Sequence, residues 1–170
     1  MNTVLIGMRC SGKSSIAKML GKKLKLDVVD TDKLIEKKLK MDISEIVEKK
    51  GWDFFREKEK EVVMEVSKLE NIIISTGGGT MTDPENRKAL KENGKVIYLY
   101  ITPETSIQRQ MEEKNRPKLT TLENIKDEVN QIYLKRNGEY CQSSDIIIER
   151  SEDLKKDCEE IISKLTQYDY

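Results

Sequence analysis

Residues 7–14, GMRCSGKS, constrain the fold of this chain more than any other segment. They match the pattern GxxxxGK[ST], follow the apolar run at 4–6 and open a helical pattern that starts near Ser11. In such a strand–loop–helix unit, glycines let backbone amides surround a phosphate group, and the helix N-terminus adds a favourable dipole. Lys13 can then reach the terminal phosphates and the Ser14 hydroxyl can bind Mg²⁺. A glycine-rich turn with an incidental lysine is the alternative, but the flanking patterns favour a phosphate-binding loop.

Further apolar runs and helical patterns alternate along the rest of the chain. The runs at 4–6, 28–29, 72–74, 96–101 and 146–148 are predicted to be strands buried on both faces. After the first helix, helices are predicted at 33–40, 43–50, 54–69, 86–93, 103–112, 122–140 and 152–165. Such alternation predicts an α/β fold with a mostly parallel sheet between two layers of helices. The polar stretch at 113–121 is expected to be a mobile loop.

The composition excludes several classes of protein. Thirty-one basic residues balance 31 acidic ones, so the net charge gives no reason to expect nucleic acid or a membrane as partner. The longest apolar run, 96–101, is much shorter than the roughly 18 residues of a membrane-spanning helix. The chain enters its first strand-like run at Thr3 without a basic region and a long apolar stretch before it, so we expect no secretory signal. Three cysteines without a CxxC pair are typical of reduced thiols. We therefore expect one cytoplasmic domain over residues 1–170, as a monomer.

The absence of histidine leaves carboxylates and lysines as candidate proton acceptors. Asp30-Thr31-Asp32 follows the second predicted strand, at the sheet edge where α/β proteins bind ligands. Asp30 is placed to hold Mg²⁺, and Asp32 is placed to accept the proton of an acceptor hydroxyl. In the alternative interpretation, one of the two aspartates only caps the helix that starts near Lys33.

A third segment, Thr76-Gly77-Gly78-Gly79-Thr80, follows the third predicted strand. Three successive glycines allow a ligand to lie against bare backbone, although a flexible turn is the alternative. The chain has no Asn-Lys-x-Asp pattern for guanine, and its third strand does not end in the Asp-Glu of motor ATPases. The remaining pattern is that of a small-molecule kinase.

With these segments taken together, the chain resembles the shikimate kinase family along nearly its whole length, weakening after about Arg150. The resemblance rests on the order of the motifs more than on any one of them. They are the phosphate loop, Asp30-Thr31-Asp32 with Leu34-Ile35-Glu36, Phe55-Arg56 with Glu59, Ser75-Thr76-Gly77-Gly78-Gly79, Arg116-Pro117, and Arg136 with Tyr140. The family's fold has a five-stranded parallel sheet in a three-layer sandwich. Its mobile lid corresponds to about 111–122 and its substrate-binding helical segment to about 33–60.

The resemblance implies transfer of the γ-phosphoryl of MgATP to the 3-hydroxyl of shikimate, and it implies a role for each matching residue. Shikimate carries a carboxylate, which a guanidinium can bind with two parallel hydrogen bonds. The implied catalytic residues are Lys13, Asp32 and Arg116; the metal ligands are Ser14 and Asp30. The implied ATP-binding residues are Arg9, Cys10, Ser11, Gly12, Lys13, Ser14, Ser15, Arg109, Arg116 and Arg150. The implied shikimate-binding residues are Asp32, Arg56, Gly77, Gly78, Gly79 and Arg136.

The chain departs from the family's pattern at Cys10, Lys118 and Gly138, which bears on lid packing and loop rigidity more than on activity. A thiol beside Lys13 and a helix N-terminus is expected to react with alkylating reagents and to be protected by ATP. Two other functions stay open: a kinase of another small acid or nucleotide, such as gluconate, and a catalytically silent relative. Retention of Lys13, Ser14, Asp30 and Asp32 argues against the silent relative.

Overall fold

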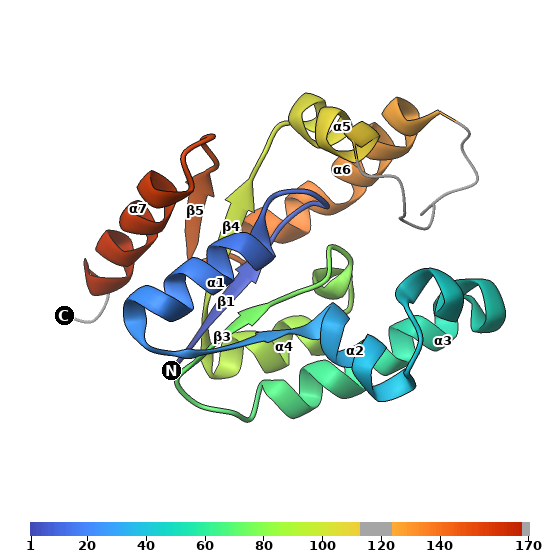
Figure 1. Cartoon of the computed structure of the whole chain (residues 1–170), viewed down its shortest axis with the longest axis horizontal. Helices are drawn as coiled ribbons and strands as arrows, with labels where there is room; N and C mark the ends of the chain where they lie inside the picture. Colours follow the sequence, from blue (N-terminus) through green and yellow to red (C-terminus); the bar gives the residue numbers. More distant parts are fainter. Residues whose placement is uncertain (113–123, 168–170) are drawn as a thin grey trace.

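The computed structural model describes residues 1–112 and 124–167 of the chain. Its centre is a parallel sheet with strand order β2-β3-β1-β4-β5, and helices cover both faces (Figure 1). The strands are β1 Asn2–Ile6, β2 Asp27–Asp30, β3 Ile72–Ser75, β4 Gly94–Tyr100 and β5 Ile146–Glu149. The predicted three-layer α/β fold with a five-stranded parallel sheet is confirmed.

The helices follow the predicted pattern with ends shifted by a few residues. They are α1 Lys13–Leu24, α2 Thr31–Leu39, α3 Ile43–Val66, α4 Pro84–Glu92, α5 Pro103–Glu112, α6 Ile125–Ser143 and α7 Leu154–Gln167, with the 3₁₀ helix η1 Thr80–Thr82. The two helices predicted at 43–50 and 54–69 are parts of α3, which is interrupted where Gly51 has φ 85° and ψ 168°. The short helix η1 was not predicted. The predicted lid lies almost entirely outside the described residues.

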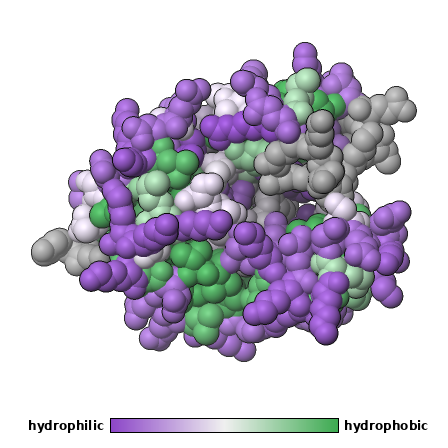
Figure 2. Space-filling model, in the orientation of Figure 1, coloured by the Kyte–Doolittle hydropathy of each residue, from purple (hydrophilic) through white to green (hydrophobic). Residues whose placement is uncertain are grey.

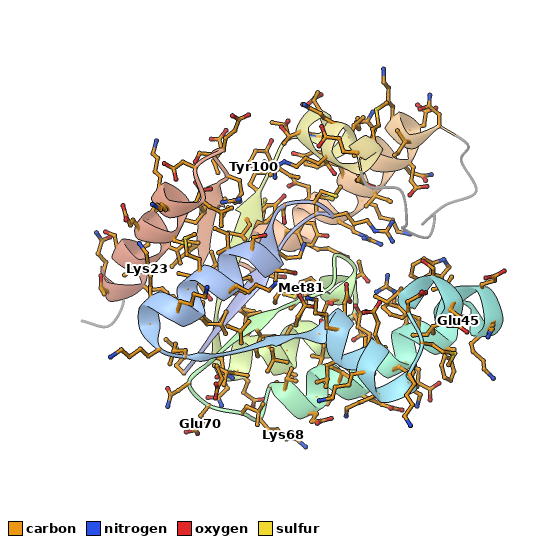
Figure 3. The ribbon with its side chains drawn as sticks, viewed as in Figure 1. Lys23, Glu45, Lys68, Glu70, Met81 and Tyr100 are labelled. Atoms are coloured by element: carbon orange, nitrogen blue, oxygen red, sulfur yellow. The ribbon has the colours of Figure 1, made fainter. Side chains whose placement is uncertain are left out.

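Two hydrophobic cores lie on opposite faces of the sheet, because successive residues of a strand point to opposite sides. On one face, Leu5 and Ile97 pack with Ile16 of α1 and Ile161 of α7. The other, larger core contains residues of α3 and α6; its members include Val4, Ile6, Ile74, Phe55, Val63, Tyr98 and Tyr140. In Figure 3, Met81 lies inside the molecule while Glu45 and Lys68 lie at its periphery. The view in Figure 2 shows a mostly hydrophilic surface.

The prediction that all strands are buried on both faces is wrong for β2 and β5. Both are edge strands, and Val28 is 37% exposed and Ile147 is 48% exposed. Ile146 and Ile148 face the core shared with α7, whereas the alternate residue Ile147 points to the opposite face and is exposed. Within the described residues, no helix has the length and apolar character needed to cross a bilayer.

The sheet order places the candidate functional residues at one edge. β1 lies between β3 and β4, so the chain turns to one side of β1 to form β2 and β3 and to the other side to form β4 and β5. The loop after β1 therefore sits where the strand order reverses, which is where open α/β sheets bind ligands. Asp30 at the end of β2 is in register with Ser75 at the end of β3, so the segments after these strands open onto the same edge.

Candidate active site

The phosphate-binding loop and the segments after β2 and β3 line one cleft of about 1120 Å³. Helices α3, α5 and α6 contribute further side chains to it. The residues predicted from sequence that line the cleft are Arg9, Cys10, Gly12, Lys13, Ser14, Ser15, Asp30, Asp32, Arg56, Gly77, Gly78, Gly79, Arg109 and Arg136. Ser11 and Arg150 lie outside this lining, and the predicted Arg116 lies outside the described residues.

The phosphate-binding loop depends on backbone conformations that favour glycine. Gly7 has φ 146° and Gly12 has φ 84°, and a Cβ on Gly7 would lie 2.6 Å from the carbonyl oxygen of Leu99. Cys10 also has a positive φ, 60°, which costs a residue with a side chain about 1 kcal/mol. This conformation explains why a glycine or small residue suits that position. Lys13 folds over the loop, and its Nζ donates to the carbonyls of Gly7 at 2.9 Å and Met8 at 2.8 Å.

Asp30 has two roles in the structure, one local and one directed at the loop. Its Oδ1 accepts from the backbone amide of Lys33 at 3.2 Å and thereby caps α2. Its Oδ2 accepts from the Ser14 hydroxyl at 2.6 Å. The capping interpretation therefore holds for Asp30, but it does not exclude the other one. These are hard oxygen donors, which fit Mg²⁺. The described residues contain no cluster of three or more metal-ligating side chains, so phosphates and water would complete such a site.

Asp32 is the most unusual carboxylate of the cleft. It lies in the first turn of α2, and its Oδ1 is buried without a hydrogen-bond partner among the described residues. The pKa of Asp32 is raised to about 6, mainly by burial and also by the negative charges of Glu59 and Asp30, while Lys13 and Arg56 oppose this shift. A buried acceptor without a donor is costly. Asp32 is half-buried and lines the cleft, so its carboxylate lies next to the space that a ligand would occupy.

Arg56 is held in place by the buried carboxylate of Glu59, a residue for which the sequence predicted no role. Glu59 is 1% exposed; its Oε2 lies 2.5 Å from Arg56 Nη1, and its Oε1 accepts from the Thr80 hydroxyl at 2.8 Å. The guanidinium also lies over the rings of Trp52 and Phe55, at 5.4 and 5.3 Å. The i,i+3 spacing of Arg56 and Glu59 on one helix was a signal for this pair. No sequence pattern indicated the hydrogen bond from Thr80 to Glu59.

Arg136 approaches the glycine segment from α6. Its Nη1 donates to the carbonyl of Gly78 at 3.2 Å, and the same carbonyl accepts from the Tyr140 hydroxyl. Tyr140 is buried and its ring packs against Tyr98, with centroids 5.1 Å apart. Two cationic side chains, Arg56 and Arg136, thus reach one cleft from different helices, which provides a site for an anionic group.

Replacing Gly77 by alanine is expected to destabilise the protein by about 1–3 kcal/mol, because the new methyl group has no room. Its Cβ would lie 2.6 Å from Asp32 Oδ1 and 2.8 Å from Glu59 Oε1. Gly138→Ala is the matched control, since a Cβ there meets nothing within 4 Å inside α6. We expect the control to stabilise the fold by about 0.5–1 kcal/mol. Urea unfolding measures both free energies; equal values for the two variants would contradict the described packing.

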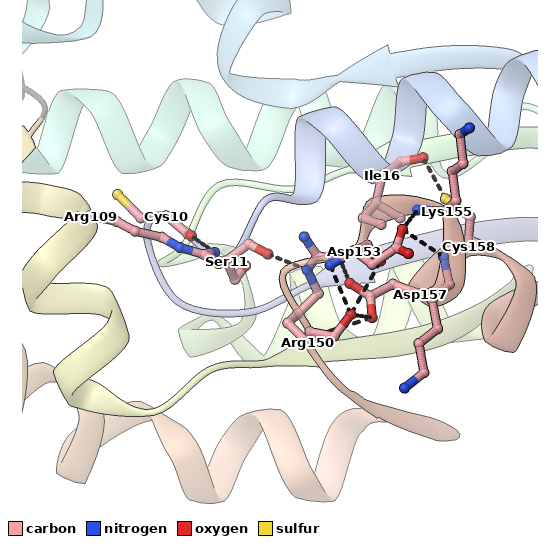
Figure 4. A network of polar contacts seen from close by, with 11 residues as sticks. Cys10, Ser11, Ile16, Arg109, Arg150, Asp153, Lys155, Asp157 and Cys158 are labelled. Atoms are coloured by element: carbon pink, nitrogen blue, oxygen red, sulfur yellow. Dashed lines mark hydrogen bonds and ion pairs between the residues drawn. The ribbon is translucent and has the colours of Figure 1, made fainter.

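Two of the predicted ATP-contacting arginines, Arg109 and Arg150, donate hydrogen bonds to carbonyls of the phosphate-binding loop. Arg109 lines the cleft and its Nη1 donates to the carbonyl of Cys10 at 2.9 Å. Arg150 is placed behind the loop, where its Nε donates to the carbonyl of Ser11 at 3.0 Å (Figure 4). The loop is therefore contacted by Arg109, which lines the cleft, by Arg150, which does not, and by Lys13.

Comparison with known proteins identifies the family. The family model for shikimate kinase matches residues 9–166. The chain is 47% identical to a shikimate kinase from Caldicellulosiruptor saccharolyticus over 118 residues, which cover 69% of each chain. It is 38% identical to a shikimate kinase from Francisella tularensis subsp. novicida over 149 residues, which cover 87% of this chain and 84% of the relative.

Comparison with solved structures also finds shikimate kinases. A solved structure of shikimate kinase from Acinetobacter baumannii in complex with shikimate superposes with a TM-score of 0.93 at 30% identity, covering 98% of this chain and 93% of the other. A gluconokinase from Sinorhizobium meliloti superposes with a TM-score of 0.61 at 11% identity, which shows a shared fold only. The chain belongs to the shikimate kinase family.

Proposed function

We propose that this chain transfers the γ-phosphoryl group of ATP to the 3-hydroxyl of shikimate and releases ADP. Membership of the shikimate kinase family supports this reaction. The observation that carries it is the position of Asp32, a carboxylate that lines the cleft. The cleft that contains it is also lined by the phosphate-binding loop and by Arg56 and Arg136. This arrangement fits an acceptor that has both a hydroxyl and an anionic group.

The acceptor would be held by its two kinds of polar group. Arg56 and Arg136 would bind the carboxylate of shikimate, because guanidinium groups bind carboxylates through paired, charge-assisted hydrogen bonds. Asp32 and the backbone of residues 77–79 would receive the ring hydroxyls, and the glycines leave space for the ring to approach. The stacking of Arg56 on Trp52 and Phe55 reduces the freedom that its side chain loses on binding.

The phosphates of ATP would be held by the amides at the start of α1 and by Lys13, which must leave the carbonyls of Gly7 and Met8 to reach them. Ser14 and Asp30 would hold Mg²⁺, which supplies positive charge next to the phosphates when it is bound. Arg109 would contact the nucleotide from α5, and Arg116 is proposed to act from the lid. These assignments follow from the residues that line the cleft and from the family resemblance.

Phosphoryl transfer depends mainly on positioning and on neutralisation of charge, because its transition state is loose. Asp32 would orient the hydroxyl and take its proton late, as the bond from oxygen to phosphorus forms and ADP leaves. An aspartate with a pKa of about 6 is too weak a base to ionise an alcohol beforehand. Lys13 would stabilise the charge on the phosphoryl oxygens.

The remaining expectations concern partners. The balance of 31 basic and 31 acidic residues gives no reason for a nucleic acid or membrane partner, and a cytoplasmic monomer stays the proposed form. A gluconate kinase would share the fold but has no reason to place Arg56, residues 77–79 and Arg136 around one carboxylate site.

The product identifies the reaction. After incubation with MgATP and shikimate, ³¹P NMR should show a phosphate ester whose signal is split by one ring proton, together with ADP. Inorganic phosphate as the only new signal besides ADP would mean hydrolysis and would contradict the proposal.

Cys10 gives an independent test of where the nucleotide binds. Cys10 is half-buried and lines the cleft, Cys141 is exposed on α6, and Cys158 is buried. We expect MgATP to slow alkylation of Cys10 by about 10-fold or more, because bound phosphates cover the loop. Labelling rates followed by mass spectrometry measure this protection. Cys141 is the internal control, whose rate should not change; equal slowing at both cysteines, or at neither, would contradict a nucleotide in this cleft.

A further inference from the structure

Three consecutive carbonyl groups of the phosphate-binding loop accept hydrogen bonds from side chains outside the loop. The donors belong to α5 and to the segment after β5, and two of these contacts appear in Figure 4. They are Ser106 Oγ to the carbonyl of Arg9 at 3.2 Å, Arg109 Nη1 to that of Cys10 at 2.9 Å, and Arg150 Nε to that of Ser11 at 3.0 Å. The loop is thus held by residues distant in sequence, of which Arg109 lines the cleft and Ser106 and Arg150 do not.

The contact from Arg150 fixes more than one atom. In a trans peptide the C=O and the following N–H point in opposite directions, so a donor that fixes the Ser11 carbonyl also fixes the direction of the Gly12 amide. Gly12 is the N-cap of α1 and lines the cleft, whereas Ser11 does not. Amides at a helix start have no intrahelical acceptor and are the groups that bind phosphate. Arg150 therefore acts on the anion site from behind.

Arg150 is itself fixed by a buried ion pair. Its side chain is 4% exposed and that of Asp157 is 2% exposed, and Arg150 Nη1 contacts Asp157 Oδ2. The other oxygen, Asp157 Oδ1, accepts from the amide of Ser151 at 3.1 Å and from its hydroxyl at 2.8 Å. Asp157 lies in the first turn of α7, so the contacts connect that helix to the loop. Burial lowers the pKa of Arg150, and the charge of Asp157 opposes this effect.

The guanidinium of Arg150 packs closely against the backbone of the phosphate-binding loop. A Cβ on Gly12 would lie 3.0 Å from Arg150 Nη2, and Gly12 has φ 84°. The guanidinium therefore lies directly against the loop backbone. Arg150 contacts Ser11, Gly12 and Asp157. It is not among the residues that line the cleft.

We propose that Arg150 and Asp157 are a positioning pair that holds the phosphate-binding loop in the shape that accepts the phosphates of ATP. Arg150 acts through the Ser11 carbonyl and the Gly12 amide, and Asp157 acts through Arg150. The proposal rests on the proposed role of the loop in binding ATP. It gives α7, which follows the point where the family motifs weaken, a part in the active site.

Arg150→Lys is the first variant, because it keeps a cation opposite Asp157 and so avoids leaving a buried charge unpaired. One ammonium cannot reproduce the rigid fork that reaches both Asp157 and the Ser11 carbonyl. We expect a melting temperature close to that of the wild type and an affinity for MgADP about 10-fold lower, measured by calorimetric titration without shikimate. Inorganic pyrophosphate, tested as a competitor, should lose affinity by a similar factor, since the loop binds the phosphates.

Variants of Asp157 show whether Arg150 positions the loop or contacts the nucleotide directly. Asp157→Asn keeps Arg150 but removes its charged partner, and it should also weaken both ligands. The double variant Arg150→Met/Asp157→Leu replaces the ion pair by apolar side chains, which often preserves folding. It should fold and show the same loss of affinity. Glu159→Gln is the matched control: Glu159 lies on α7 and pairs with Lys23 of α1 at 3.1 Å, at the surface and away from the loop.

Each outcome decides the proposal. Weakened binding in folded Arg150→Lys, Asp157→Asn and the double variant, with Glu159→Gln unchanged, supports it. Wild-type affinity in any folded variant of the pair overturns it, and loss with the Arg150 variants alone indicates direct contact with the nucleotide instead. If the other two variants unfold, Arg150→Lys decides. A wild-type protein that binds MgADP but does not phosphorylate shikimate would contradict the proposed function alone.

Discussion

The Asp32→Asn variant is expected to lose kcat by about 10²–10⁴-fold while its affinity for MgADP stays within a few-fold of the wild type. Asparagine has nearly the same shape, but it cannot take the proton of the acceptor hydroxyl. Asp32 lines the cleft, whereas the neighbouring carboxylates Asp30 and Glu59 are engaged with Ser14 and Arg56. Steady-state kinetics with saturating MgATP and shikimate measure the loss.

The same residue determines the expected pH dependence. The base must be ionised to accept a proton, and the pKa of Asp32 is raised to about 6 by burial and by Glu59 and Asp30. In the wild type, kcat/KM should therefore be constant above about pH 7 and fall as the pH drops through about 6, because kcat/KM reports the pKa values of the free enzyme. The inflection should be missing in Asp32→Asn. Unchanged kcat in the variant, or an inflection that persists in it, would contradict the role of Asp32.

Stability should change in the opposite direction to activity. The folded protein binds the Asp32 proton more tightly than the unfolded chain, so the free energy of unfolding falls as the pH rises from about 4 to 6. Above that range the ionised carboxylate costs up to about 3 kcal/mol, a shift from 3.8 to about 6 at 1.36 kcal/mol per unit. Asp32→Asn should therefore be more stable than the wild type at pH 8. Asp27→Asn, at the exposed other end of β2, is the control and should change neither quantity.

The second large effect concerns binding of the acceptor. Arg136→Met should raise the KM for shikimate by about 30-fold or more and leave the KM for ATP nearly unchanged, because loss of one partner of a buried charge pair costs about 2–5 kcal/mol. Arg136 lines the cleft and its Nη1 donates to the carbonyl of Gly78. Initial rates over a matrix of both substrate concentrations separate the two KM values.

The neighbouring residue is the control for this variant. Lys135→Met removes a cation one residue earlier on α6, where the side chain is exposed and does not line the cleft. Its two KM values should be those of the wild type. A rise in the KM for ATP with Arg136→Met, or equal effects of the two variants on shikimate, would remove Arg136 from the acceptor site.

Much of this fold could be predicted from local signals in the sequence. The pattern at 7–14 requires a strand before it and a helix after it, and the structure has β1 and α1 there. Separate helices were predicted at 43–50 and 54–69, and α3 is interrupted between them at Gly51, a residue type that destabilises helix interiors. The exposure of Val28 and Ile147 was not, because it depends on which strands lie at the edges of the sheet.

In the candidate site, too, local motifs could be predicted from the sequence, whereas contacts between distant residues could not. Residues in motifs next to strands, such as Ser14, Asp30 and Gly77, line one cleft because the ends of parallel strands meet at one edge. The contact of Arg150 with Ser11 joins residues 139 positions apart, and no local pattern encodes it. The double role of Asp30, as helix cap and partner of Ser14, likewise required coordinates, because each role alone satisfies the sequence pattern.

The most direct measurement is the release of ADP in a coupled assay with shikimate, quinate, gluconate or no acceptor. We predict rapid release with shikimate, because its carboxylate and 3-hydroxyl match Arg56, Arg136 and Asp32 in one cleft. Release without an acceptor should be only a small background. Activity with gluconate or a nucleotide and none with shikimate would contradict the central claim.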